Sequence, residues 1–334
     1  MVKGPKTRQS VWAELEEIRT QRAEVASTVP PLEIAFAIND GIIADTHIKK
    51  KGAPGKRTQG ALVRRGFLQV LGGQKLPESA KGSGRLELAD WLTQPDNSLT
   101  ASVMVNRVWH YHFGLGLVTT PSDFGVRGTA PTHPGLLDHL ATEFMNNGWA
   151  VKQMHRAIMA PRTYRLTNED YAANLAVDPG NQLLWRANRR RLDAEQLRDA
   201  LLVFSGELDR KPGGRHPFPH HLTYFPAART VSGEVCIQKR SIYLMQQRIQ
   251  KNPYLDLFDG PDGSLYFGER RSTVTTLQAL YFMNSEFIHE QADAIAERLA
   301  KAATGSTPLV QAEKQAWSSL VRSMLSSNEF LHVE

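Results

Sequence analysis

Apolar residues recur at helical spacing through most of the sequence after residue 84. The clearest case is the segment 192–208, which predicts a helix. Asp193 can cap its start, and Gln196 three residues later completes a capping box. The apolar face of this predicted helix carries Leu197, Leu201, Phe204 and Leu208. This region of the chain is therefore expected to pack helix against helix.

The same pattern predicts further helices, while short alternating runs predict strands. Helices are expected at 10–27, 85–93, 97–113, 133–149 and 150–164, with two or three more near the C-terminus. Strands are expected at 34–40, 44–52 and 236–248. The predicted fold class is mainly α: a helical globular domain with a small β-containing N-terminal segment, α+β overall.

A linker-like stretch separates two predicted regions. Residues 72–84 are rich in Gly and contain Pro, Ser and Lys, which is typical of a connector. We therefore expect an N-terminal region at 1–83, with one helix, short strands and a basic Gly-rich connector. The helical domain is expected at 84–334.

Composition narrows the function classes. Hydrophobic residues make up 41% and charged residues 22% of the chain, which is globular composition. The formal charge of +6 allows an anionic partner without requiring one. A single cysteine, Cys236, excludes an intrachain disulfide, a Cys-x-x-Cys-His haem attachment and a cysteine zinc cluster. No run is apolar enough to predict a membrane span, and the N-terminus lacks a signal-peptide pattern, so localisation stays open.

Several motifs are only nearly present. "HEQAD" at 289–293 lacks the second histidine of the helical zinc-protease signature. His110 and His112 would point about 200° apart on a helix, so they predict no two-histidine metal site. "HPFPHH" at 216–221 is a loose histidine cluster that could bind metal adventitiously. No cofactor or metal is therefore expected in this chain. Basic runs lack interleaved aromatic residues, so nucleic acid is an unlikely partner.

The segment 97–113 carries the first candidate site. Asn106 and His110 are i, i+4 neighbours on the predicted helix, with Arg107 beside them. As a binding site, Asn106 or Arg107 would hold an anionic or polar substrate. As a structural feature, the three groups would be satisfied by carbonyls of the Gly-rich segment 114–125, and this interpretation is favoured.

A catalytic interpretation extends that site along the chain. His110 or His133 would be the acid or base, and Asp123 would be the orienting partner. Such a cluster would suit a hydrolase-type reaction.

The second candidate site lies at the helix 192–208. Arg191, Glu195 and Arg198 could line a binding groove, together with Asp199. Salt-bridged packing of this polar face against a neighbouring helix is the favoured alternative. For Arg189, Arg190 and Arg191, ion pairing within or beside the helix is the simplest role.

Long segments, in order, resemble one known family. They include "NRVWHYHFGLGLVTTPSDFGVRG", "NQLLWRANRRRLDAEQLRDALLVFSGELD" and "STVTTLQALYFMNSEFIHEQA", and the resemblance covers residues 84–334. The chain resembles the planctomycete-type domain of unknown function called PSD-one. The resemblance implies a C-terminal domain of large exported proteins that often carry a c-type cytochrome-like module upstream. It supplies no catalytic residue, and it implies that this chain is a C-terminal fragment or a truncated product.

Three function hypotheses follow. The first is a non-catalytic interaction or scaffold module that docks other domains or an extracellular polymer in an exported, cytochrome-linked protein. The second is a hydrolase-type enzyme using the cluster at 106–133. The third is a binder of anionic polymers, which rests on the positive charge alone. Whether the protein is an enzyme stays open.

Overall fold

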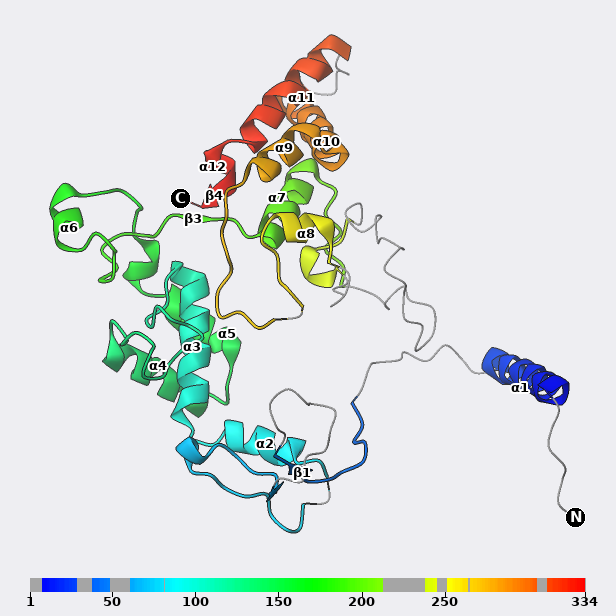
Figure 1. Ribbon diagram of the computed structural model, residues 1–334. Helices are drawn as coiled ribbons and strands as arrows, with labels where there is room; N and C mark the ends of the chain where they lie inside the picture. The colour runs from blue at the N-terminus through cyan, green and yellow to red at the C-terminus, as the bar shows by residue number, and fades with distance from the viewer. Residues whose placement is uncertain are drawn as a thin grey trace, which may run out of the picture. The chain divides into compact units, whose positions relative to one another are not determined.

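The computed structural model describes residues 8–28, 38–48, 61–80, 82–212, 238–244, 251–263, 265–304 and 311–333. Helices dominate these residues and each strand has two residues, so the predicted mainly α fold with a small β segment is confirmed (Figure 1). The chain divides into two units, Met1–Val63 and Arg64–Glu334. The boundary predicted between residues 83 and 84 stays a prediction. Within the described residues, no helix combines the length and apolarity needed to cross a bilayer.

Among its described residues, 8–28, 38–48 and 61–63, the first unit has one helix and one strand pair. Helix α1, Arg8–Thr28, confirms the helix predicted at 10–27. Strand β1, Thr46–His47, pairs antiparallel with β2, Leu62–Val63. The strand predicted at 44–52 is thus confirmed over two residues. The strand predicted at 34–40 is not formed at residues 38–40, and its other residues lie outside the described ranges.

In the second unit, three helices form what we call the first helical cluster. They are α3 (Ser98–Phe113), α4 (Pro134–Asn146) and α5 (Val151–Met159). Their buried apolar side chains include Val105, Trp109, Leu137, Phe144, Met154 and Ile158. Helix α3 ends where Gly114 adopts a left-handed conformation with φ of 76°, a conformation that glycine adopts without steric cost. This turn sends the chain back along the helix as the loop 114–133.

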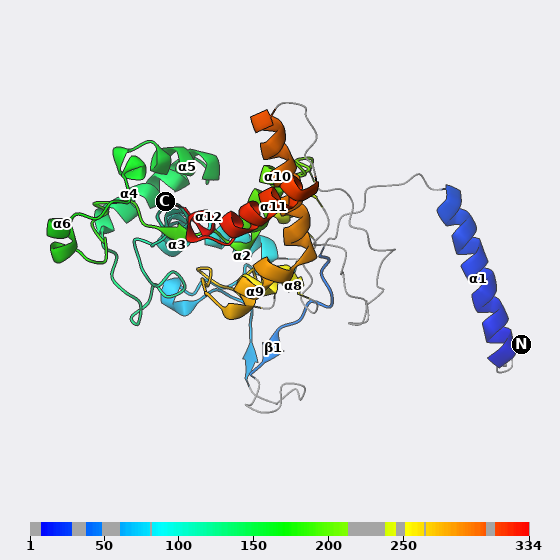
Figure 2. The same cartoon turned by 90° about the horizontal axis from the view of Figure 1, so that it is seen from above.

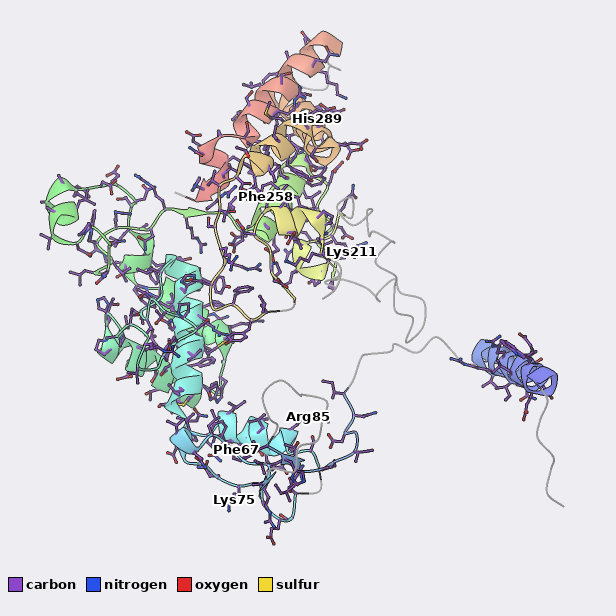
Figure 3. All side chains as sticks on the ribbon, in the orientation of Figure 1. Phe67, Lys75, Arg85, Lys211, Phe258 and His289 are labelled. Atoms are coloured by element: carbon purple, nitrogen blue, oxygen red, sulfur yellow. The ribbon has the colours of Figure 1, made fainter. Side chains whose placement is uncertain are left out.

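Six helices form the second helical cluster. They are α7 (Ala194–Ser205), α8 (Pro253–Leu257), α9 (Thr276–Asn284), α10 (Glu286–Thr304), α11 (Gln311–Leu325) and α12 (Asn328–Leu331). Helices α10 and α11 lie side by side (Figures 1 and 2). The core includes Leu197, Leu201, Tyr254, Phe258 (labelled in Figure 3), Ile288 and Val321.

The sequence predictions for the second cluster have mixed outcomes. The capping box of Asp193 and Gln196 at the start of α7 is confirmed. Phe204, however, is exposed, so the predicted apolar face of that helix is narrower than its spacing suggested. The strand predicted at 236–248 is wrong within residues 238–244, where Ser241–Tyr243 form a 3₁₀ turn.

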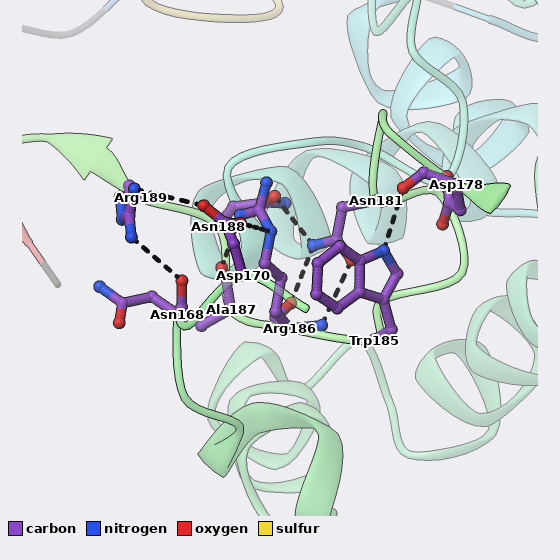
Figure 4. A network of polar contacts seen from close by, with 9 residues as sticks. All are labelled: Asn168, Asp170, Asp178, Asn181, Trp185, Arg186, Ala187, Asn188 and Arg189. Atoms are coloured by element: carbon purple, nitrogen blue, oxygen red, sulfur yellow. Dashed lines mark hydrogen bonds and ion pairs between the residues drawn. The ribbon is translucent and has the colours of Figure 1, made fainter. Parts of the chain in front are cut away.

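The segment between the two clusters is held by a polar network (Figure 4). It contains the 3₁₀ turn Arg162–Arg165, helix α6 (Ala172–Val177) and strand β3 (Arg190–Arg191), which pairs antiparallel with β4 (His332–Val333). The amide of Asn181, which is buried, donates to Asn188 Oδ1 at 3.0 Å, and Asn188 donates to the carbonyl of Phe113 at 2.9 Å. Asp170 also pairs with Arg186 at 3.0 Å. These bonds attach the segment to the end of α3 and so position β3.

A short layer precedes the first cluster. Helix α2, Arg85–Leu92, follows the 3₁₀ turn Gln69–Leu71. The ring of Phe67 stacks on Trp91 with centroids 5.0 Å apart (Figure 3). This contact fixes the turn against α2.

Candidate functional site

The side chain of Asn106 binds the loop that follows α3. Its Nδ2 donates to the carbonyl of Val118 at 3.0 Å, and the Val118 amide donates to Oδ1 at 2.8 Å. The residue is fully buried. A Cβ at Gly116 would lie 2.5 Å from the Val118 oxygen, so only glycine fits there. For Asn106, the predicted structural role is what the geometry supports.

Asp123 and His133 take part in local turns. Asp123 Oδ1 accepts from the Gly125 amide at 2.9 Å, and His133 Nδ1 lies 3.0 Å from the hydroxyl of Thr132. Among the hydrogen bonds of the described residues, none joins Asp123 to His110 or His133. The catalytic grouping of these three residues therefore stays a prediction without a geometric link.

His110 is partly buried and lies within the electrostatic influence of a group of charges. Burial lowers the pKa of His110, while the negative charges of Glu269 and Asp193 raise it and that of Arg190 lowers it again. The three partners come from β3, the start of α7 and the segment before α9. The i, i+4 spacing predicted one polar network for Asn106 and His110. Among the described residues, no hydrogen bond joins the two side chains to a common partner.

The pKa of Asp193 is shifted in the opposite direction to that of His110. Burial raises the pKa of Asp193, and the positive charges of Arg270, Arg190 and His110 only partly oppose this, with Glu195 adding to the rise. Burial thus moves the pKa values of His110 and Asp193 in opposite directions.

Glu195 and Arg270 complete this group, which we call the charged junction: His110, Arg190, Asp193, Glu195, Glu269 and Arg270. Arg270 Nη2 donates to Glu195 Oε1 at 2.7 Å. Glu195 Oε2 and Arg270 Nη1 are enclosed and have no hydrogen-bond partner within the described residues. Arg270 and Glu269 also line a polar pocket of about 210 Å³. The junction can therefore accept one further polar group.

The two arginines of β3 donate hydrogen bonds to segments other than α7. Arg190 donates to the carbonyl of Tyr111, at the end of α3, and Arg191 donates to the carbonyl of Thr273. Arg191 Nη2 also donates to Gln278 at 3.0 Å. Within the described residues, a backbone carbonyl and a side-chain amide take the donors of Arg191, so the ion pairing expected for the arginines within or beside this helix stays a prediction.

Arg198 lies inside the second cluster. Only 1% of its side chain is exposed, and Nη1 donates to the Lys239 carbonyl at 2.9 Å and to Ser241 Oγ at 3.2 Å. Asp199 lies 3.8 Å from the same nitrogen and accepts from Ser241. Arg198 therefore connects α7 to the 3₁₀ turn at Ser241, and does not line a groove.

Arg107 has a different environment from both of its predicted partners. It lines a pocket of about 360 Å³ between α2, the turn at Gln69–Leu71 and the first half of α3. The other lining residues are Leu68, Leu71, Trp91, Leu92, Asn97, Leu99, Thr100, Val103 and Met104. Arg107 Nε and Asn97 Oδ1 are enclosed without hydrogen-bond partners in the described part of the chain. We call this the Arg107 pocket.

The sequence pattern missed several residues of these sites. Glu269 and Arg270 belong to a stretch without helical or strand periodicity. Trp91 lies in α2, across a turn from Arg107, and Asn97 precedes α3 nearly three turns before Arg107. A signal for Asp193 did exist, because it caps α7. Its proximity to His110 depends on packing between the clusters, which no local pattern encodes.

Comparison with known families assigns the chain to one family. The model of the family described as "Protein of unknown function (DUF1553)", PSD1, matches residues 84–331, about three quarters of the chain. The protein belongs to this family, which confirms the resemblance seen in the sequence. Arg107 and the charged junction lie inside the match. No curated protein and no solved structure matches the chain.

Proposed function

We propose that the chain is an interaction module and that the Arg107 pocket docks a segment of another protein domain. The segment would present large apolar side chains beside a carboxylate. The apolar side chains would fill the pocket, and the carboxylate would pair with Arg107.

The observation that carries this proposal is the guanidinium without a partner. Arg107 is half-buried, yet it makes no hydrogen bond or ion pair with any described residue. A partly desolvated cation costs free energy unless a hydrogen-bonded anion compensates it. A bidentate carboxylate is the group that matches the planar guanidinium best. An incoming acidic residue would thus remove a cost that the free chain bears.

The rim of the pocket favours a protein segment over a small solute. Leu68, Leu92, Leu99 and Met104 line the pocket and are 38–61% exposed, and neighbouring Val70 is 86% exposed. Contiguous exposed apolar surface marks interaction sites on folded proteins. Arg and Trp residues are also the side chains that most often dominate binding energy at interfaces, and this pocket has Arg107 and Trp91.

The wider setting of the module rests on the family resemblance alone. Such domains typically belong to exported proteins with a c-type cytochrome-like module, and that module would be one source of the docking segment. Any haem would be held there, since this chain is expected to bring none.

Random-peptide display against the whole chain tests the proposal. We expect enriched peptides to share two or more large apolar residues next to Asp or Glu. Synthetic versions should bind Arg107→Met at least about tenfold more weakly, the equivalent of one lost charge-assisted contact. Arg127→Met, on an exposed loop residue, is the matched control and should bind as the unchanged chain does.

Three results would contradict the proposal. Selection could yield no enriched peptide, or peptides without an acidic residue. Enriched peptides could also bind Arg107→Met and Leu71→Asp with unchanged affinity, which would place the binding surface elsewhere.

The second candidate function is an acid–base enzyme of hydrolytic type at the charged junction. The opposite pKa shifts of His110 and Asp193 favour it, because neighbouring groups with diverging pKa values can act as base and acid. Glu195 and Arg270 would bind the polar part of the substrate through their free atoms.

A panel of p-nitrophenyl esters and glycosides tests this alternative. The enzyme hypothesis expects turnover that disappears in both His110→Gln and Asp193→Asn while the fold is retained. Equal rates in the unchanged chain and both variants would reject it.

A further inference from the structure

We propose that His112 and His155 form a binding site for a late first-row divalent cation such as Zn²⁺ or Cu²⁺. This site is separate from the docking pocket and the charged junction. His112 lies in the last turn of α3 and His155 lies in α5. Their ring nitrogens, Nε2 of His112 and Nδ1 of His155, are 2.7 Å apart.

The separation of the two nitrogens is close to that of two ligands on one ion. Zinc–nitrogen bonds of about 2.0–2.1 Å place neighbouring ligand nitrogens about 2.9–3.4 Å apart. A small opening of the pair would therefore admit an ion. Without one, the two rings share a hydrogen bond.

Tyr164 orients one of the two rings. Its hydroxyl lies 3.2 Å from Nδ1 of His112. When Nδ1 donates to this oxygen, the lone pair of His112 is on Nε2, the atom that faces His155. A hydrogen bond on the second ring nitrogen is the usual support of a metal-binding histidine.

The local electrostatics also bear on a cation. His112 is near the C-terminus of α3, where the helix dipole favours positive charge. The positive charge of Arg190 acts on His112, and it would oppose a cation and so limit the affinity.

The ligand count sets the kind of site. In the ranges that the structure describes, no three His, Cys, Asp or Glu side chains gather as metal ligands would. His112 and His155 would supply two ligands, and water or a partner would supply the rest. Imidazole ligands select zinc, copper and nickel over magnesium or calcium, with Cu²⁺ bound most tightly.

Calorimetric titration of the whole chain with Zn²⁺ tests the site. Because 216–221 holds three other histidines, the starting protein carries His216→Ala, His220→Ala and His221→Ala. We expect one Zn²⁺ per chain. His155→Gln, which keeps a hydrogen bond to His112, should weaken binding at least about tenfold. Tyr164→Phe should weaken it less.

The matched control is His139→Gln, which changes an exposed histidine of α4 and should leave the affinity unchanged. Circular dichroism of each variant checks the fold, and Cu²⁺ should bind more tightly than Zn²⁺ to the starting protein. Absence of saturable binding in the starting protein would overturn the proposal. Equal Zn²⁺ affinity in His155→Gln would do the same.

Discussion

Two arginines that the sequence predicted as binding residues differ in how their charge is compensated. Arg198 lies in α7 of the second helical cluster, and Arg107 lies in α3 of the first. Arg198 is 1% exposed and donates to a carbonyl and a hydroxyl, with Asp199 nearby. Arg107 is less buried but has no hydrogen bond or ion pair in the described part of the chain. Hydrogen bonds within the fold thus compensate the buried guanidinium of Arg198, whereas none compensates that of Arg107 among the described residues.

This difference separates residues that hold the fold from residues that can serve a ligand. A buried polar group whose hydrogen bonds offset most of its desolvation stabilises the native state, as Nη1 of Arg198 does, although its Nε has no hydrogen-bond partner among the described residues. A partly enclosed charge without partners does the reverse unless something binds it. The charged junction lies between these extremes, since Glu195 and Arg270 pair through one atom each and leave one atom free.

The largest loss of stability is expected for Arg198→Ala. It removes a buried guanidinium that pairs at 3.8 Å with the partly exposed Asp199, and it leaves the carbonyl of Lys239 without its donor, which should lower the free energy of unfolding by about 3–5 kcal/mol. Urea unfolding measures this value. Arg210→Ala, on an exposed residue after α7, should change it by less than about 0.5 kcal/mol. Similar values for both variants would mean that burial of Arg198 does not matter.

Asn106→Ala should rank next. The variant leaves the buried amide and carbonyl of Val118 without their partner, which should lower the free energy of unfolding by about 1–3 kcal/mol. The exposed Asn146→Ala in α4 serves as the control for replacing an asparagine in a helix. An unfolding curve for Asn106→Ala that overlays the control would refute the structural role of this residue.

Acid should destabilise the fold through the partly buried histidines His110 and His112, by a smaller amount. Burial lowers the pKa of His110 and of His112 in the folded chain below the ordinary value of 6.5. Both rings are neutral in folded and unfolded chains well above 6.5. Below it the unfolded chain takes up protons first, so the free energy of unfolding falls as pH decreases.

Unfolding of His110→Gln over pH about 7.5 to 5 isolates its ring from other titrating groups. The contribution of Asp193 to the pH dependence of stability has the opposite sign, because its raised pKa makes the folded chain take up a proton before the unfolded chain does. We expect a flatter pH profile for His110→Gln than for the unchanged chain and for His139→Gln. A profile as steep as that of the unchanged chain would show that His110 is not desolvated.

The helices of the fold could largely be predicted because their apolar residues repeat locally. The capping box of Asp193 and the helix around Asn106 are encoded within a few neighbouring residues. The strand predicted at 236–248 failed because Ser241 is held by Asp199, a contact 42 residues away, rather than by a strand neighbour.

The candidate sites were less predictable, for the same reason. Helical spacing grouped Asn106 with His110, but Asn106 binds Val118, whereas the charges that act on the pKa of His110 include those of Glu269 and Asp193. The pairing of His112 with His155 joins two helices and could not be inferred from the "HYH" spacing. Local periodicity determines which residues lie on a helix, and packing between helices determines which of them meet.

The unfolding free energy of Arg107→Met tests the central claim most directly, since it needs no ligand. If the fold does not use this guanidinium, the apolar replacement should leave the value within about 0.5 kcal/mol of the unchanged chain or raise it. A decrease of about 2 kcal/mol or more would contradict the account, because it would show that Arg107, like Arg198, holds the structure together.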